Sequence, residues 1–130
     1  MRRVGYATLT FGTGLLTAAA PMTDSPRAAK PGLWEISHSA TGVAAERICL
    51  PDPMILSQWE HRGGACTRVV IADLGAELTI HYTCAGGGFG QSTVTLLTLR
   101  TMRIETQGIS DGLPFNYVLH ARRKGDCLPR

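Results

Sequence analysis

Residues 66–84 read CTRVVIADLGAELTIHYTC, and this stretch decides the fold class because it holds two strand-like runs joined at a glycine. The runs are residues 67–73 and 77–84, and Gly75 between them can supply the positive φ that a tight turn needs. Apolar residues alternate with polar ones in the second run, which is the pattern of a half-buried strand. Its apolar positions are Leu78, Ile80 and Tyr82. The stretch therefore predicts an antiparallel hairpin with one apolar face.

The same alternation appears on both sides of this hairpin. After it, the pattern predicts strands at residues 92–99, 102–107 and 115–123. Before it, residues 31–40 (PGLWEISHSA) and 46–50 hold two more short strand-like runs. A short helix cannot cover seven flat strands, so the sheet should curl. We expect a mainly β fold, a curved antiparallel meander sheet or open barrel of about seven strands with one short helix.

The one segment with a helical pattern is PDPMILSQWE at residues 51–60. Asp52 can cap the helix N-terminus, and Pro53 fits the first helical position. Ile55 and Trp59 lie one helical turn apart, with Leu56 beside them. We expect a short helix over about residues 53–60 that docks this side on the sheet, since burying a large apolar side chain contributes about 1.5 to 3 kcal/mol.

The cysteines Cys49, Cys66, Cys84 and Cys127 indicate two disulfides, because an even number of cysteines in a small exported domain is typical of a disulfide framework. A zinc site would require close pairs such as C-x-x-C, and the sequence has none. Three connectivities are open. We favour Cys49 with Cys66, which closes a local loop containing the helix, and Cys84 with Cys127, which ties the last strand to the sheet.

The first 20 residues have the three regions of an export signal peptide. Arg2 and Arg3 precede a moderately apolar stretch at residues 4–16, and small alanines follow at residues 18–20. We expect cleavage after Ala19 or Ala20 and a mature protein in the periplasm or secreted. The apolar stretch is shorter than the roughly 20 residues of a membrane span, so no span is expected after cleavage. Residues 21–30 (PMTDSPRAAK) should form a flexible lead-in, and residues 31–130 a single domain.

The charge balance argues against a nucleic-acid partner. The chain has 13 Lys+Arg and 10 Asp+Glu, a net charge of +3, and removal of Arg2 and Arg3 leaves +1. The basic run at residues 122–124 is too short to follow a phosphate backbone.

The residues that can carry chemistry form no recognisable reaction centre. The glycine run at residues 86–90 precedes a β-patterned segment and not a helix, which favours a hairpin loop over a phosphate-binding loop. His81 and His120 fall on the polar sides of their strands, which favours solvated surface positions. There is no G-x-S-x-G turn, and the thiols are assigned to disulfides. We therefore assign no catalytic, cofactor-binding or metal-binding residue.

Four aromatic residues are candidates for lining a small apolar pocket between the sheet and the helix. They are Trp34, Trp59, Phe115 and Tyr117. In a domain of this size the same side chains can instead fill the core, and this is the simpler interpretation.

Three motifs resemble a known family. PGLWEIS at residues 31–37, CLPDP at 49–53 and the closing ARRKGDC at 121–127 are similar, in this order, to the bacterial family of domains of unknown function numbered 3617. The resemblance covers about residues 31–127 and implies an exported envelope protein. The family has no established activity, so the resemblance implies no catalytic residues. GGGFGQS at residues 86–92 and TQGISDGLPFNY at 106–117 depart from the more polar middle of many members.

The sequence thus favours an exported, non-enzymatic module that binds either a small apolar ligand or an envelope protein partner. The alternative is a small envelope hydrolase or lyase with a dispersed polar site. Convergence of perturbed titratable groups in one cleft would favour the enzyme, and an apolar cavity or exposed patch would favour the binding module.

Overall fold

The computed structural model describes residues 5, 9, 12–16 and 24–129. It contains two 3₁₀ helices, η1 (Pro26–Ala28) and η2 (Pro53–His61). The strands are β1 (Gly32–Ser37), β2 (Glu46–Leu50), β3 (Cys66–Asp73), β4 (Glu77–Cys84), β5 (Phe89–Thr98), β6 (Thr101–Ser110) and β7 (Leu113–Gly125). The expected mainly β class is therefore confirmed.

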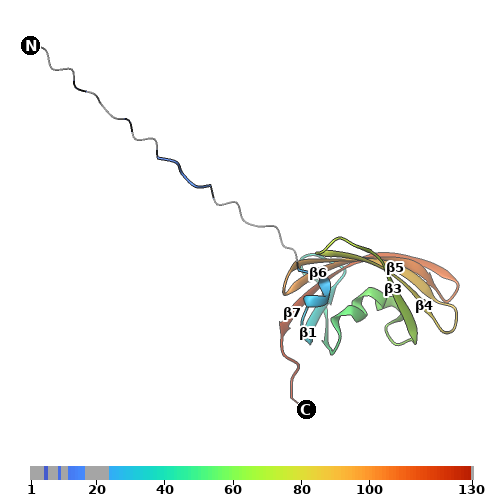
Figure 1. Cartoon of the computed structure of the whole chain (residues 1–130). Helices are drawn as coiled ribbons and strands as arrows, with labels where there is room; N and C mark the ends of the chain where they lie inside the picture. Colours follow the sequence, from blue (N-terminus) through green and yellow to red (C-terminus); the bar gives the residue numbers. More distant parts are fainter. Residues whose placement is uncertain (1–4, 6–8, 10–11, 17–23, 130) are drawn as a thin grey trace, which may run out of the picture.

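The strands form one antiparallel seven-stranded sheet in the order β2-β1-β7-β6-β5-β4-β3. Strands β3 to β7 follow one another as the expected meander, and the β1–β2 hairpin joins the sheet beside β7. Strands β2 and β3 lie at opposite edges, so the sheet is open, as expected, and does not close on itself. The sheet arches over η2, which lies on its concave side (Figure 1). We call the concave side the inner face and the convex side the outer face.

The core lies between the inner face and η2. Alternate residues of each central strand are buried, so the period-two pattern correctly predicted which side faces inward. In β4, for example, Leu78, Ile80 and Tyr82 are all buried. The core cluster consists of Ala29, Trp34, Ile36, Leu50, Leu56, Trp59, Leu78, Ile80, Val94, Leu96, Met102, Ile104, Leu119 and Ala121.

Helix η2 differs from the expected helix in its periodicity. The Asp52 carboxylate accepts a hydrogen bond from the Met54 N–H at 3.0 Å, so the predicted cap is confirmed. The segment is a 3₁₀ helix with a kink at Gln58, and Pro53, Leu56 and Trp59 are buried at intervals of three residues. Ile55, expected to share the buried side with Trp59, is only partly buried.

Buried hydrogen bonds explain why η2 is fixed in this position. The Ser92 hydroxyl of β5 donates to the Ser57 carbonyl oxygen at 2.6 Å. It is also hydrogen-bonded to the Thr106 hydroxyl of β6 at 2.7 Å. The helix is therefore attached to the middle of the sheet by polar contacts as well as apolar packing, because a carbonyl left unpaired in the core would be costly.

The structure contains two disulfides, as expected, but the favoured pairing is wrong. The bonds are Cys49–Cys127 and Cys66–Cys84. Cys66 lies directly opposite Cys84 in the β3–β4 pair, so the hairpin register itself brings these two together. Cys49 lies opposite Leu33, which in turn lies opposite Gly125, so this register carries Cys49 to the end of β7 near Cys127.

Only some of the predictions for the N-terminal segment concern residues that the structure describes. The expected cleavage site at Ala19 or Ala20 lies outside them. Within the expected lead-in at residues 21–30, η1 packs against the domain: Pro26 and Ala29 are buried, and the Arg27 and Asp73 side chains approach to 3.7 Å. The packed part of the chain thus begins ahead of Pro31. Among the described residues, no helix is long and apolar enough to cross a membrane.

Candidate functional site

The outer face carries two parallel rows of side chains near one end of the strands. Strand register places His81 opposite Gln91, Gln91 opposite Gln107, and Gln107 opposite Asn116. We call these four residues the amide row. Two residues further along the strands, on the same face, Phe89 lies opposite Ile109 and Ile109 opposite Pro114, and we call these three the apolar row. Both rows line one hollow of about 560 Å³, which we call the outer groove.

Two paired glycines also line the outer groove. Gly90 of β5 lies directly opposite Gly108 of β6 and also opposite Tyr82 of β4. A Cβ atom at Gly90 would lie 2.6 Å from the Tyr82 hydroxyl oxygen, so only glycine allows this approach. The Cβ atom missing at Gly90 would point toward Tyr82 on the inner face, so this glycine contributes only backbone atoms to the outer groove.

The amide row has free hydrogen-bonding groups. Gln91, Gln107 and Asn116 are exposed, and His81 is partly exposed. Within the described part of the chain, the side chains of these four residues make no hydrogen bond to other protein groups. A smaller hollow of about 260 Å³, lined in part by Thr93 and Glu105, shares the three amide side chains and continues the groove along the outer face. Glu105 there is paired with Arg103 at 3.0 Å.

A polar and aromatic cluster lies behind the groove, on the inner face at the end of η2. His61 Nδ1 and the Tyr82 hydroxyl are hydrogen-bonded at 2.9 Å, and the Tyr117 hydroxyl donates to Glu60 Oε2 at 2.8 Å. The Phe115 ring lies 5.9 Å from the His61 ring and 5.7 Å from the Tyr117 ring. We call these five residues the inner cluster.

The tyrosines of the inner cluster are held in their neutral form. Burial, assisted by the negative charge of Glu60, raises the pKa of Tyr82 to about 12. Burial, followed by the hydrogen bond to Glu60, raises the pKa of Tyr117 still further above its ordinary value. Both phenols are therefore uncharged near neutral pH and do not act as bases.

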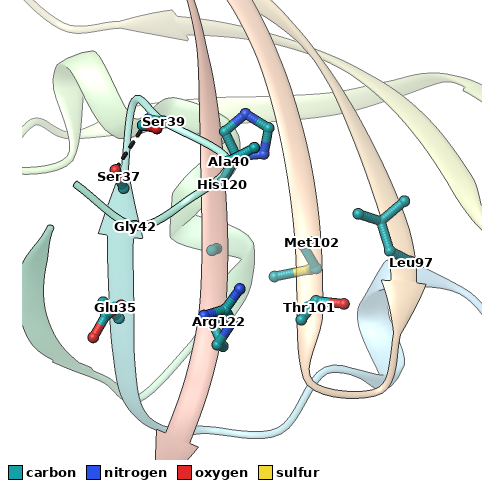
Figure 2. Close-up of a pocket in the computed structure, with 11 residues that line it drawn as sticks. Glu35, Ser37, Ser39, Ala40, Gly42, Leu97, Thr101, Met102, His120 and Arg122 are labelled. Carbon is teal, nitrogen blue, oxygen red and sulfur yellow. Dashed lines mark hydrogen bonds between the residues drawn. The ribbon is translucent and has the colours of Figure 1, made fainter.

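A third hollow, of about 290 Å³, lies between β1, β7 and the β1–β2 loop (Figure 2). Four of its polar side chains, those of Glu35, Ser37, Ser39 and Thr101, already have partners, whereas His120 and Arg122 have none among the described residues. The Ser37 hydroxyl donates to the Val43 carbonyl at 2.7 Å and accepts from the Ser39 N–H at 3.0 Å (Figure 2 draws the second contact). Glu35 is paired with Arg47 at 3.4 Å. Because these groups hold the loop against the sheet, this hollow has fewer groups left for a ligand than the outer groove.

The structure separates the four candidate ligand-lining residues. Trp34 and Trp59 lie in the core, where the Trp34 indole N–H donates to the Lys30 carbonyl at 3.1 Å. Tyr117 belongs to the inner cluster and packs against the core. The Phe115 ring belongs to the inner cluster, and Phe115 is also among the residues that line the outer groove. Among the described residues, no group of three or more His, Cys, Asp or Glu side chains is arranged to hold a metal ion.

These features define a small β domain with one curved sheet, a helix on its inner face and two disulfides. Two disulfides suggest an oxidising, extracytoplasmic location. The family model described as "Protein of unknown function (DUF3617)" matches residues 29–127, so the chain belongs to the DUF3617 family and the resemblance predicted from its motifs is confirmed. No curated protein and no solved structure matches the chain.

Proposed function

We propose that this protein is an extracytoplasmic binding module whose ligand occupies the outer groove. The observation that supports this most is the amide row, a line of side chains with free donors and acceptors beside an apolar row. A few convergent polar groups next to apolar walls are typical of ligand sites. The expected small apolar ligand is thereby extended to one that also has polar groups.

The enzymatic alternative has less support. The inner cluster does gather titratable groups, but Tyr82 and Tyr117 stay neutral, and His61 and Glu60 are each already hydrogen-bonded to one of them. Within the described residues, the cluster therefore functions as a packed and hydrogen-bonded support for the strands behind the groove.

Binding in the outer groove is testable by nuclear magnetic resonance, because side-chain amide groups give their own signals. We expect a chemically diverse fragment library added to the ¹⁵N-labelled mature domain to include compounds that shift the Gln91, Gln107 and Asn116 side-chain signals together. Gln107→Ala should weaken these compounds, whereas Thr95→Ala, on the same outer face two positions along β5 from Thr93, should not. A library that shifts no groove signal would contradict the proposal.

A protein partner is the second candidate function, and the edge strand β3 supports it. Val69 and Ile71 are each 55% exposed, and Leu74 in the following turn is 75% exposed. An edge strand with exposed apolar side chains can pair with an extended segment of another protein. We expect photo-crosslinkers at positions 69 and 71, introduced in the native envelope, to recover the same extended apolar segment of one partner. Recovery of unrelated segments from the two positions would contradict this second proposal.

A further inference from the structure

The outer groove is almost free of formal charge. Among the described residues, its lining contains no Asp, Glu, Lys or Arg, and His81 is its one titratable side chain. Glu105, in the smaller hollow that continues the groove, is paired with Arg103. A charged ligand would leave water and find no opposite charge there, which is unfavourable. The groove therefore fits a neutral ligand.

The amide row fits a ligand that has many hydroxyl groups. Each Gln or Asn side chain offers two N–H donors and one carbonyl acceptor, and a hydroxyl group can likewise both donate and accept. Adjacent hydroxyls on one ring can thus engage both halves of one amide. The four residues occupy four neighbouring strands spaced about 4.8 Å apart, so the row is roughly 14 Å long and fits an elongated ligand.

The apolar row requires that the same ligand also have an apolar face. Phe89 is 41% exposed, and Ile109 and Pro114 extend its surface across β6 and β7. A sugar ring combines a face of C–H groups with a rim of hydroxyls, so it can stack on the apolar row while its rim contacts the amide row. A purely apolar molecule would instead cover the side-chain amides without forming hydrogen bonds to them, which is unfavourable.

From these features together we infer that the outer groove binds a neutral oligosaccharide chain, with Gln91, Gln107 and Asn116 contacting its hydroxyls and Phe89 stacking on a ring. The inference rests on the proposed function and adds the chemical class of the ligand.

The test is a titration of the ¹⁵N-labelled mature domain with neutral glucan and chitin oligosaccharides, an acidic oligogalacturonate and the apolar fragment indole. We expect the neutral saccharides to shift the Gln91, Gln107 and Asn116 side-chain signals. Gln91→Ala and Gln107→Ala should each weaken binding about 2- to 10-fold, the usual worth of one hydrogen bond. Phe89→Ala should weaken it about 10-fold, and the outer-face control Thr95→Ala should leave it unchanged.

The other outcomes overturn the inference in distinguishable ways. If indole shifts the groove signals and no saccharide does, the ligand class is wrong although the groove still binds. If the acidic saccharide binds as tightly as the neutral ones, the groove does not select for uncharged ligands. If the saccharides shift only signals outside the groove, the site is wrong. If no compound shifts the groove, both the inference and the proposed function fail.

Discussion

Trp34 and Trp59 are the residues on which the core depends most, because they fill it from opposite sides. Trp34 comes from β1 with no exposed surface, and Trp59 comes from η2 with 6% of its surface exposed. Truncating a large buried aromatic side chain typically costs about 3 to 5 kcal/mol, a large share of the roughly 5 to 15 kcal/mol that stabilises a domain. We expect Trp34→Ala and Trp59→Ala each to lower the urea midpoint strongly.

His81 and His120 provide the matched comparison on the outer side of the sheet. Both are only partly buried, and within the described residues neither side chain makes a hydrogen bond. His81→Ala and His120→Ala should therefore shift the urea midpoint little. Tryptophan variants that melt like the unmodified protein, with water-exposed emission from the remaining indole, would show that the indoles do not fill the core.

The tyrosines of the inner cluster make stability fall at high pH. The raised pKa of about 12 for Tyr82 means that the folded state prefers the neutral phenol, whose ordinary pKa is about 10. This contribution is fully present below about pH 10 and is lost as the pH rises through about 12. We expect tyrosinate absorbance to appear together with unfolding in this range. A normal titration near pH 10 in protein that remains folded would contradict the buried placement.

Glu60 supplies a second, local test of the inner cluster. In a Tyr82→Phe background, Tyr117 is the one tyrosine of the expected mature chain, so its ionisation can be followed alone. Glu60→Gln removes the charged acceptor of the Tyr117 hydroxyl, and the pKa of Tyr117 should therefore fall. An unchanged titration would mean that burial alone sets the pKa of Tyr117.

At the residue scale, burial could be predicted from the sequence but polar partners could not. Alternation placed Leu78, Ile80 and Tyr82 on the buried side correctly. The hydrogen bond between His61 and Tyr82 could not be predicted, because the two residues lie 21 positions apart in the sequence. That contact depends on how η2 crosses the sheet, which no local pattern encodes.

Among the elements, the disulfides should contribute unequally to stability. Cys49–Cys127 joins residues separated by 78 positions, and Cys66–Cys84 joins residues separated by 18. In the chain-entropy model, closing the longer loop stabilises by roughly 1 kcal/mol more. We expect the Cys49→Ser/Cys127→Ser double variant to be less stable to urea than Cys66→Ser/Cys84→Ser. The reverse order would indicate that the β3–β4 edge depends on its own cross-link.

The sequence pattern predicted correctly which segments form strands. It did not predict where the strands begin and end, or that the helix is of the 3₁₀ type. The predicted run at residues 77–84 coincides with β4, whereas β5 begins at Phe89, three residues before the predicted strand. Gly88 and Gly90 indicated a loop there, but strand pairing with β4 and β6 overrides that local preference. The pairing of Cys66 with Cys84 could have been found by extending the predicted hairpin to its ends.

For the molecule as a whole, the export prediction remains to be tested by mass. Arg2, Arg3 and the alanines at residues 18–20 predict a processed protein without its first ~20 residues. We expect intact-mass measurement of the envelope fraction to show this shortened form. A full-length chain found mainly in the cytoplasm would contradict the exported location and remove the oxidising environment that the disulfides require.

The outer groove is the feature that could not be predicted from the sequence. Its rows combine residues from β4, β5, β6 and β7, so they become visible only when the register of four strands is known. Phe89 lies in the glycine run at residues 86–90 that was predicted as a hairpin loop, and His81 was assigned to the solvated surface. The individual positions are ordinary, and only their alignment across the sheet makes a site.

The measurement that tests the central claim most directly is the detection of contacts between an oligosaccharide and the apolar row. In a ¹³C-labelled mature domain saturated with a neutral glucan oligosaccharide, we predict intermolecular nuclear Overhauser effects from the sugar ring protons to the Phe89 ring and to Pro114. Bound saccharide whose contacts lie only on the inner face or along β3 would contradict a binding site in the outer groove.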